Sequence, residues 1–510
     1  MRLPAFAAAL AIMLTAAPAV ARSIAGAPVV VEAPAGALEG RVDDGVEAFV
    51  GIPYVAPPVG PLRWRAPAPA PRWTGVRPAA TFGNDCPQQR LPGDLTPSDQ
   101  PMSEDCLTLN LWRPAGGRRL PIMIWIHGGG FVMGSSSAAV LDGAALARRG
   151  VVLVSFNYRI GRFGFFAHPA LSAEAGGHPA ANFAFLDMIA ALRWVQANGA
   201  AFGGDPANVT IFGESAGGAA VNFLMGTPAA QGLFHKAIVQ SGANREPYAR
   251  LALPRPGRIP AEAAGIAFAV RAGLADASAD QLRALPADIV QGALSLFDQQ
   301  PDRFAGPAID GDTVLADPIE RFAAAAVPAV PYLIGSNSAE LSEEAFAPLM
   351  MDFLRSQIGA EGMAGLEQVY GRPPAPGLID DYFFGEAARG YARIMSARGA
   401  LARLYLFDHV AEADRANRRG ANHASEIAYL FGNLPAAAGA SDHETARLMG
   451  DYWVNFARTG DPNGAGLPHW PRHGAGDPLL RFGASGAASE QTRNAERLDA
   501  VERAMAARPR

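Results

Sequence analysis

A serine between two glycines is the residue whose setting most clearly indicates chemistry in this sequence. Ser215 lies in Gly213-Glu214-Ser215-Ala216-Gly217, directly after the apolar run Val209–Phe212 and before small residues that can open a helix. A serine at such a strand-to-helix turn, a nucleophile elbow, can attack a carbonyl carbon once a base has taken its proton. Because the chain contains 56 glycines, the pattern alone can arise by chance, and the flanking strand and helix carry the interpretation.

A nucleophilic serine requires a base, an acid that orients the base, and donors for the oxyanion. When the serine sits on an elbow of this kind, the chain order is Ser, then Asp or Glu, then His. His423 is the preferred base, because Gly420-Ala421-Asn422-His423-Ala424 is a small-residue loop after a predicted strand, and such loops carry the chemistry of α/β enzymes. The other downstream histidines are His409, His443, His469 and His473.

The acid and the oxyanion donors have candidates in similar places. Glu340 follows the predicted strand end Leu333-Ile334-Gly335-Ser336-Asn337, and Glu343 and Glu344 are rivals that the sequence does not exclude. Upstream of the serine, His127-Gly128-Gly129-Gly130-Phe131 offers backbone amides that no side chain covers. An oxyanion hole requires amides of this kind.

The elements that must position these residues are alternating strands and helices. The expected strands cover residues 107–112, 121–127, 151–156, 209–212, 236–240, 330–334 and 401–407, and the expected helices cover 144–149 and 182–198. This alternation predicts an α/β fold with a doubly wound, mostly parallel sheet. Residues 22–85 are expected to form edge strands and loops, 490–510 a surface helix, and 245–325 and 341–400 helical insertions over the active site.

The composition is typical of a soluble globular protein with a large buried core. Of the 510 residues, 49% are hydrophobic and 18% are charged, and no linker-like stretch divides the middle of the chain. We therefore expect one main domain over residues 22–510. The net charge of −5 argues against a nucleic-acid binder or a polybasic membrane-surface protein. The expected partner is a small molecule.

The first 21 residues have the pattern of a secretory signal peptide. Arg2 precedes the apolar stretch Ala5–Ala17, which is too short to span a membrane, and Ala19-Val20-Ala21 is a small-residue cleavage site. We therefore expect residues 1–21 to be removed. The mature protein would be secreted or periplasmic, with no membrane anchor.

Cys86 and Cys106 are the two cysteines of the chain, and both follow the predicted signal peptide. In an oxidising compartment we expect them to form a disulfide, which would contribute about 3 kcal/mol through loop-closure entropy. Two free buried thiols are the alternative. No histidine or further cysteine lies nearby at ligand spacing, so no metal site is expected, and the predicted chemistry requires no cofactor.

Several further motifs, in the same order along the chain, resemble those of the type-B carboxylesterase and lipase family, which includes the cholinesterases. They are Gly51-Ile52-Pro53-Tyr54, Glu104–Asn110, His127–Phe131, Phe202–Pro206, the elbow and Trp453–Asn463. The resemblance implies an α/β-hydrolase fold, the disulfide and serine carboxylesterase activity.

The resemblance also implies the roles of individual residues. Ser215 is then the nucleophile, Glu340 the acid and His423 the base, with oxyanion amides from Gly129, Gly130 and Ala216. Ser241 matches a position that supports the triad in the family, and a strand-end serine satisfied by the backbone is the alternative. Two positions depart from the family pattern. Ala339-Glu340-Leu341 stands where Asp-Glu-Gly is usual, and Ala424 follows the histidine where glycine is common.

These residues predict a serine carboxylesterase that acts through an acyl-enzyme intermediate. Two alternatives are a binding protein, since some relatives lost the triad and serve in adhesion, and an acyltransferase, which would use the same residues. The presence of all three triad residues in order favours catalysis. An ordinary histidine base predicts activity that rises through about pH 6 to 7.

The lack of aromatic residues in the disulfide-closed loop limits the expected class of substrate. In the cholinesterases, which this chain resembles, the disulfide-closed loop brings an aromatic ring that holds a quaternary ammonium by cation–π attraction. No Trp, Tyr or Phe lies between Cys86 and Cys106. We therefore expect a preference for neutral alkyl or aryl esters of small acids, in a pocket lined in part by Phe131.

Overall fold

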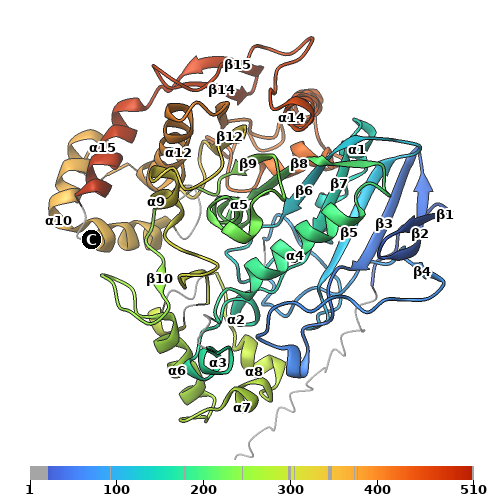
Figure 1. The fold of residues 1–510 in the computed structure, drawn as a ribbon. Helices are drawn as coiled ribbons and strands as arrows, with labels where there is room; N and C mark the ends of the chain where they lie inside the picture. The colour runs from blue at the N-terminus through green and yellow to red at the C-terminus, as the bar shows by residue number, and fades with distance from the viewer. Residues whose placement is uncertain are drawn as a thin grey trace, which may run out of the picture.

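A 13-stranded sheet organises the molecule (Figure 1). The computed structural model describes residues 21–91, 93–176, 180–243, 245–296, 300–303, 305–342, 347–372, 374–375 and 377–507. The strands of this sheet are β1 (Ala27–Ala33), β2 (Gly36–Asp43), β3 (Val46–Pro53), β4 (Val76–Pro78), β5 (Thr108–Pro114), β6 (Leu120–Ile126), β7 (Val152–Phe156), β8 (Gly204–Glu214), β9 (Lys236–Gln240), β12 (Tyr332–Asn337), β13 (Ala402–Phe407), β14 (Pro478–Gly483) and β15 (Gly486–Gln491).

The centre of the sheet is parallel and its edges are antiparallel. The strand order is β1-β2-β3-β5-β7-β6-β8-β9-β12-β13-β14-β15, with β4 paired to β2. Every neighbouring pair from β7 to β14 is parallel, whereas the pairs from β1 to β7 along this order and the pair β14–β15 are antiparallel. The predicted mostly parallel α/β sheet is confirmed. The carboxyl ends of the central strands share one edge, where α/β enzymes bind their ligands.

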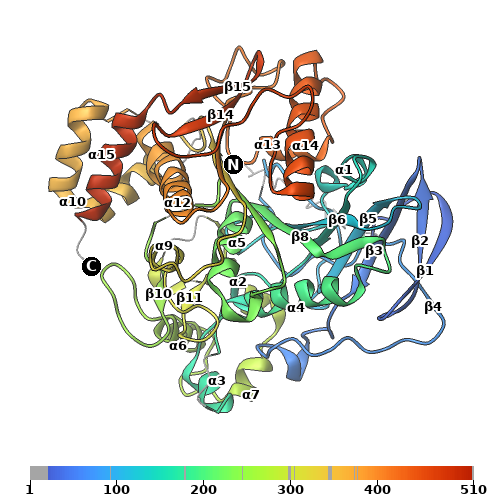
Figure 2. The same cartoon turned by 45° about the horizontal axis from the view of Figure 1, so that its top comes forward.

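Helices cover both faces of the sheet, as Figures 1 and 2 show. On β6, Ile122, Ile124 and Ile126 pack into one core with residues of α4 (Phe183–Asn198), α5 (Ala216–Gly226) and α12 (Glu386–Ala397). Met123 and Trp125 point into a second core with α1 (Ala144–Arg148), α13 (Glu426–Phe431) and α14 (Ala440–Thr459). Since successive side chains of a strand point to opposite faces, a strand buried on both faces must be apolar throughout. Burial on both faces therefore explains the near-continuous apolar runs of the sequence.

Most of the remaining helices form two smaller groups outside the sheet, while one of them packs through Phe322 into the core that contains α4, α5 and α12. The helices are α2 (Gly161–Gly164), α3 (Pro169–Glu174), α6 (Ala261–Arg271), α7 (Ala279–Arg283), α8 (Ala287–Gln291), α9 (Pro318–Ala323), α10 (Ala347–Tyr370), α11 (Gly377–Asp380) and α15 (Ala495–Ala506). A two-stranded sheet pairs β10 (Ala249–Arg250) with β11 (Ala308–Ile309). α10 and α15 pack together at one end of the molecule (Figure 1).

Two features of the fold differ from the expectation. The segment 341–400 was expected to be an insertion, but its last helix, α12, packs on β12 and β13 and its Ala387, Tyr391 and Met395 belong to the main core. Because this segment is rich in alanine, its sequence did not indicate that it contains a helix of the main core. β14 and β15 were not expected at all, since β15 carries mainly small and polar residues and lies on the edge of the sheet.

The structure does not describe the predicted signal peptide or two of the candidate acids. The predicted signal peptide lies outside the described residues except for Ala21, and so do Glu343 and Glu344. Among the described helices, none is long and apolar enough to cross a membrane.

Candidate active site

The turn that carries Ser215 is a tight elbow between β8 and α5. Ser215 has φ 54° and ψ −124°, values that side-chain-bearing residues rarely adopt. Its amide donates to the carbonyl of Gln240, the last residue of β9, at 2.9 Å. Gly217 has no room for a side chain, because a Cβ there would lie 2.0 Å from the carbonyl oxygen of Ile126. The elbow therefore holds the serine where β6, β8 and β9 end, as the glycine pattern predicts.

Glu340 and His423 form a close pair at the same edge of the sheet. Glu340 Oε2 lies 2.6 Å from His423 Nδ1, and the amide of His423 donates to the carbonyl of Glu340 at 3.0 Å. Glu340 follows β12 and is fully buried, and its Oε1 accepts a hydrogen bond from the amide of Asn337 at 2.8 Å. This carboxylate can hold the imidazole in one orientation, with the proton on Nδ1.

A second carboxylate lies on the other side of the imidazole. Glu214 Oε1 is 3.2 Å from His423 Nε2. Within the described part of the chain, no hydrogen bond joins the imidazole to Ser215 Oγ. The structure thus pairs His423 with Glu340 and Glu214, and it does not pair His423 with the serine.

The two carboxylates change the acidity of the site. Burial raises the pKa of Glu214 well above its usual value, an effect that the neighbouring imidazole opposes. Burial also works to lower the pKa of His423, but the charges of Glu214 and Glu340 outweigh it and raise that pKa above the ordinary histidine value. The expected rise of activity through pH 6 to 7 assumed an ordinary histidine. The geometry moves the expected rise to higher pH.

The glycine run after β6 lies beside the elbow and leaves amides free. A Cβ on Gly128 would lie 3.1 Å from the Cβ of Ser215. The amides of Gly129, Gly130 and Ala216 donate to no acceptor among the residues that the structure describes, and Gly129 has φ 96°, which favours glycine. Free amides near a nucleophile can stabilise a developing negative charge on oxygen.

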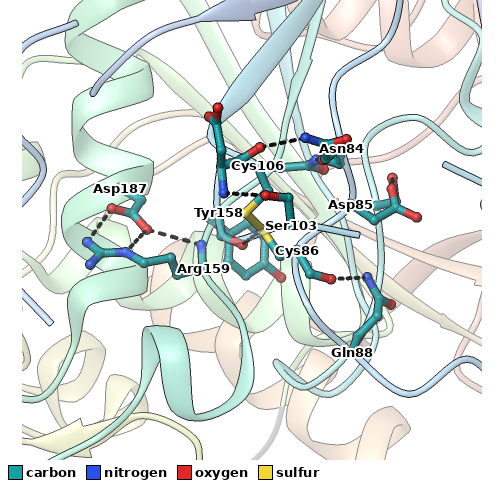
Figure 3. Close-up of a disulfide and its surroundings, with 12 residues drawn as sticks. Asn84, Asp85, Cys86, Gln88, Ser103, Cys106, Tyr158, Arg159 and Asp187 are labelled. Atoms are coloured by element: carbon teal, nitrogen blue, oxygen red, sulfur yellow. Dashed lines mark hydrogen bonds and ion pairs between the residues drawn. A yellow bond between two sulfur atoms is a disulfide. The ribbon is translucent and has the colours of Figure 1, made fainter. Parts of the chain in front are cut away.

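The predicted disulfide between Cys86 and Cys106 is present and braces the glycine run. Gln88, two residues after the first cysteine, binds Gly134 twice: its Nε2 donates to the carbonyl at 2.9 Å and its Oε1 accepts from the amide at 2.7 Å. Figure 3 shows Gln88 beside Cys86, whose carbonyl accepts a further hydrogen bond from Gln88 Nε2. The loop closed by the disulfide therefore holds the far end of the segment that carries the free amides.

A cavity of about 350 Å³ lies beside Ser215. Its described walls come from the elbow, the glycine run, the end of β9 and three more distant segments. They consist of Gly130, Phe131, Val132, Ser215, Ala216, Ala219, Ser241, Gly242, Ala243, Tyr248, Leu294, Ser295, Leu296, Ala305, Gly306, Pro307, Phe383 and Phe384. None of these wall residues carries a charged side chain. Both expected insertions contribute, one through residues 294–296 and 305–307 and the other through two phenylalanines.

With this geometry established, the relatives of the chain can be compared. The chain matches the model of the Carboxylesterase family over residues 27–358 and 372–501. The chain belongs to the carboxylesterase family. Fumonisin B1 esterase of Sphingopyxis macrogoltabida is 36% identical over 474 residues, which are 88% of this chain and 85% of that protein. Para-nitrobenzyl esterase of Bacillus subtilis (strain 168) is 35% identical over 468 residues, which are 86% of this chain and 91% of that protein.

The solved structures agree with this assignment. A structure of PNB esterase matches with a TM-score of 0.80 at 31% identity, covering 92% of this chain and 99% of that chain. This carboxylesterase is thus a carboxylic ester hydrolase with the α/β-hydrolase fold. The resemblance that the motifs indicated is confirmed.

Three residues at the site of this carboxylesterase were not expected from its sequence. Phe384, in the π-helical turn Asp381–Gly385, places its ring 5.1 Å from that of His423. Asp380 accepts hydrogen bonds from the amides of Leu341 and Ser342 at 2.8 and 3.0 Å, directly after Glu340, and burial raises the pKa of Asp380 to about 7. In the sequence, the adjacent Phe383 and Phe384 within an alanine-rich segment could have indicated that this segment contributes to the site.

Glu426 is the third of these residues. Its two carboxylate oxygens accept hydrogen bonds from Asn337 Nδ2 at 2.7 Å and from Gln240 Nε2 at 3.1 Å. It thereby ties the ends of β12 and β9 to the start of α13. A charged residue directly before the apolar run Ile427–Phe431 was its signal in the sequence.

Ser241 lines the cavity, and its hydroxyl does not bond the backbone as the alternative interpretation assumed. Its hydroxyl is buried and has no hydrogen-bond partner among the described residues, while its amide donates to the carbonyl of Gly335 at 2.9 Å. A hydroxyl satisfied by the backbone is therefore the wrong description of this residue.

Proposed function

We propose that this carboxylesterase hydrolyses neutral alkyl or aryl esters of small carboxylic acids through an acyl-enzyme on Ser215. The close pair of Glu340 and His423, at the sheet edge where the elbow presents the serine, is the observation that carries the proposal. An imidazole oriented by a carboxylate is the base that a serine hydroxyl needs.

In the first half-reaction, Ser215 Oγ attacks the ester carbonyl carbon while His423 Nε2 takes the hydroxyl proton. The amides of Gly129, Gly130 and Ala216 stabilise the oxyanion of the tetrahedral intermediate. His423 then passes the proton to the alkoxy oxygen, the carbon–oxygen bond breaks, and the alcohol leaves. The required contact between Ser215 Oγ and His423 forms with ester bound, since catalytic hydrogen bonds commonly tighten in the substrate complex.

In the second half-reaction, water takes the place of the alcohol. His423 Nε2 accepts a proton from water, the hydroxyl oxygen attacks the acyl carbon, and the returned proton frees Ser215 Oγ as the acid leaves. An alcohol that replaced water at this step would give acyl transfer. The Glu340 carboxylate stabilises the imidazolium that forms in each half.

The proposed substrate class rests on the walls of the 350 Å³ cavity and on the disulfide loop. The described walls offer aromatic and aliphatic surface without a charged side chain, which suits an uncharged ester. The segment from Cys86 to Cys106 contains no aromatic residue that could hold a quaternary ammonium. Two relatives are named for the esters of fumonisin B1 and of para-nitrobenzyl compounds.

The test is a screen of esters with product analysis, run on the wild type and on Ser215→Ala. We expect the variant to keep its fold, since an elbow serine contributes little packing, and to lose kcat by several orders of magnitude, about 10⁶-fold for a comparable serine. Circular dichroism checks the fold. A variant that retains a tenth of the wild-type rate would remove Ser215 from the mechanism, and an ester product in the presence of alcohol would indicate acyl transfer.

The same screen tests the substrate class. We expect kcat/KM for p-nitrophenyl butyrate to exceed that for butyrylthiocholine. A tenfold preference for the choline ester, about 1.4 kcal/mol in transition-state binding, would contradict the proposed class while leaving the triad intact.

We propose in addition that residues 1–21 are a signal peptide and that the mature protein is secreted or periplasmic. The buried disulfide supports this assignment, because disulfides persist in oxidising compartments. Cell fractionation and N-terminal sequencing of the purified protein test it. The expected first residue is Arg22, and a mature chain that begins at Met1 would contradict the proposal.

A further inference from the structure

A second cavity, larger than the one beside Ser215, lies behind the loop that carries His423. Its volume is about 720 Å³, compared with about 350 Å³ beside the serine. Ligand pockets span about 300–1,000 Å³. The second cavity is thus of ligand size, and the reaction proposed above does not use it.

The composition of the walls explains why the space is open. Alanine is the most frequent residue on them, and the walls come from the loop Gly420–Ser425, α13, the loop at 433–438, the turn Ala139–Leu141 and the segment after β13. Short side chains on facing segments leave the volume unfilled. The half-exposed Leu95, from the disulfide-closed loop, lies at its edge.

One wall carries a buried polar pair that is already satisfied. His409 Nε2 lies 2.7 Å from Asp442 Oδ1, and His409 Nδ1 lies 3.1 Å from Thr445 Oγ1. The same carboxylate accepts hydrogen bonds from Tyr429 OH at 3.1 Å and from the amide of Gly439 at 2.8 Å. The polar atoms of this pair therefore have partners within the protein. Asp414 and Arg418 add two oppositely charged side chains to the lining, and the rest of the lining is mainly apolar, which suits a ligand without net charge.

The loop that carries His423 has bonded neighbours on its catalytic side. The amide of Ala339 donates to the carbonyl of Ala421 at 2.9 Å, and Asn337 Nδ2 donates to the carbonyl of Asn422 at 2.8 Å. On the opposite side, Asn422 and Ala424, one on each side of His423, line the cavity. Ala424 has φ 63°, a left-handed conformation that is unfavourable for a residue with a Cβ. Any molecule in the cavity therefore packs against a strained segment next to the imidazole.

We propose that this cavity, the His423 back pocket, binds a neutral, mainly apolar small molecule and that its occupation slows ester hydrolysis through His423. A ligand packed against Asn422 and Ala424 restricts the loop, while catalysis requires the imidazole to serve Ser215, the leaving alcohol and water in turn. Alcohols and phenols released by hydrolysis belong to this chemical class. The effect on the rate rests on the proposed function, but the binding does not.

The probe for binding is N-phenyl-1-naphthylamine, a neutral dye whose fluorescence rises in apolar surroundings. Val140→Trp fills the back pocket from the turn Ala139–Leu141, and Ala428→Phe fills it from α13. Val76→Trp, on an exposed edge strand away from the cavity, is the matched control. We expect both filling variants to weaken dye binding about tenfold or more and the control to bind like the wild type.

The probe for coupling is the rate of p-nitrophenyl butyrate hydrolysis at saturating dye. We expect kcat to fall about fivefold, the lower range of common coupling energies, without an increase in KM. The filling variants should not respond to the dye. Dye binding unchanged in both filling variants would overturn the site, and a dye that raises KM alone, as a competitor in the Ser215 cavity does, would overturn the coupling. Because the fluorescence titration involves no turnover, it remains decisive even if Ser215 is not the nucleophile.

Discussion

His423 is held between two carboxylates, and each has a different consequence. Glu340 contacts Nδ1 at 2.6 Å and is fully buried, so it fixes the ring and stabilises its charge. Glu214 lies 3.2 Å from Nε2, the nitrogen that exchanges protons with the serine in the proposed mechanism. In the proposed mechanism the first contact orients the base, while the second changes the pH at which the imidazole becomes neutral.

Glu340→Gln should lower kcat by about 10⁴-fold, as the loss of the orienting carboxylate does in comparable triads. An amide at this position keeps the shape but does not stabilise the imidazolium. Steady-state hydrolysis of p-nitrophenyl butyrate measures the effect. Glu343→Gln and Glu344→Gln are the comparisons, and a larger loss in either of them would transfer the role of the acid to that residue.

The pH dependence of kcat/KM should reveal the effect of Glu214 on the pKa of His423. The base must be neutral to accept the serine proton, and neighbouring negative charge favours the imidazolium, so the wild-type kcat/KM should rise at a pH above the ordinary histidine value of about 6.5. Glu214→Gln removes one of these charges. The midpoint of the rise should then fall by about one pH unit.

A matched control for this profile is Glu444→Gln, on the exposed face of α14. It removes the same charge far from the site and should leave the midpoint in place. If Glu214→Gln left the midpoint unchanged, Glu214 would be neutral when His423 titrates.

At the residue scale, what could be predicted followed from local patterns. Ser215 sits in a short motif whose glycines are required by backbone contacts, and the order of acid and histidine narrows the remaining choices. Glu426 and Phe384 could not be predicted, since their roles depend on contacts with β9, β12 and His423 that only the folded chain creates. The raised pKa of His423 likewise depends on a distance, not on a motif.

At the scale of elements, the disulfide-closed loop acts as a brace for the glycine run. Two hydrogen bonds of Gln88 hold Gly134, at the end of the segment that begins with the free amides. The disulfide fixes the position of Gln88 through its neighbour Cys86. The disulfide-closed loop, which is remote from Ser215 in sequence, thus supports the segment whose free amides lie near the serine.

Gln88→Ala should therefore impair catalysis without unfolding the protein. Loss of one oxyanion donor costs about 10²- to 10³-fold, so a loosened loop should cost less, about tenfold in kcat. Gln89→Ala, at the exposed neighbouring position, is the control and should leave kcat unchanged. Equal rates for the two variants would show that the brace has no part in catalysis.

The elements were predicted well where hydrophobic period and length agreed. The strands at β6, β7, β9 and β13 and the helix α4 match the expected runs, because burial on both faces leaves a continuous apolar pattern. The burial of α12 was not predicted. Its buried face carries small side chains such as Ala387 and Ala388, and alanines do not produce the periodic pattern of large apolar residues that indicates a core helix.

At the scale of the whole molecule, the C-terminal helix is tied to the active-site side of the fold. Arg389 on α12 is buried and bonds Asp499 on α15 at 2.7 Å, while Arg393 bonds Asp477 and Glu502. The expected surface helix is therefore partly buried, with Val501 and Ala504 packed in one core with α10. α12 directly follows the turn that carries Phe384, so α15 supports, through α12, a residue beside His423.

The strand order also determines how activity returns after denaturation. Glu340 and His423 are 83 residues apart and meet only when β9, β12 and β13 have paired in register beside β8. Such distant pairings form late, because their loop-closure entropy must be overcome first. During refolding with the disulfide intact, ester hydrolysis should lag behind the far-ultraviolet circular dichroism signal, and coincident recovery would contradict this. A reagent that titrates the nucleophilic serine would then count only completely assembled molecules, whereas spectroscopy also counts folding intermediates.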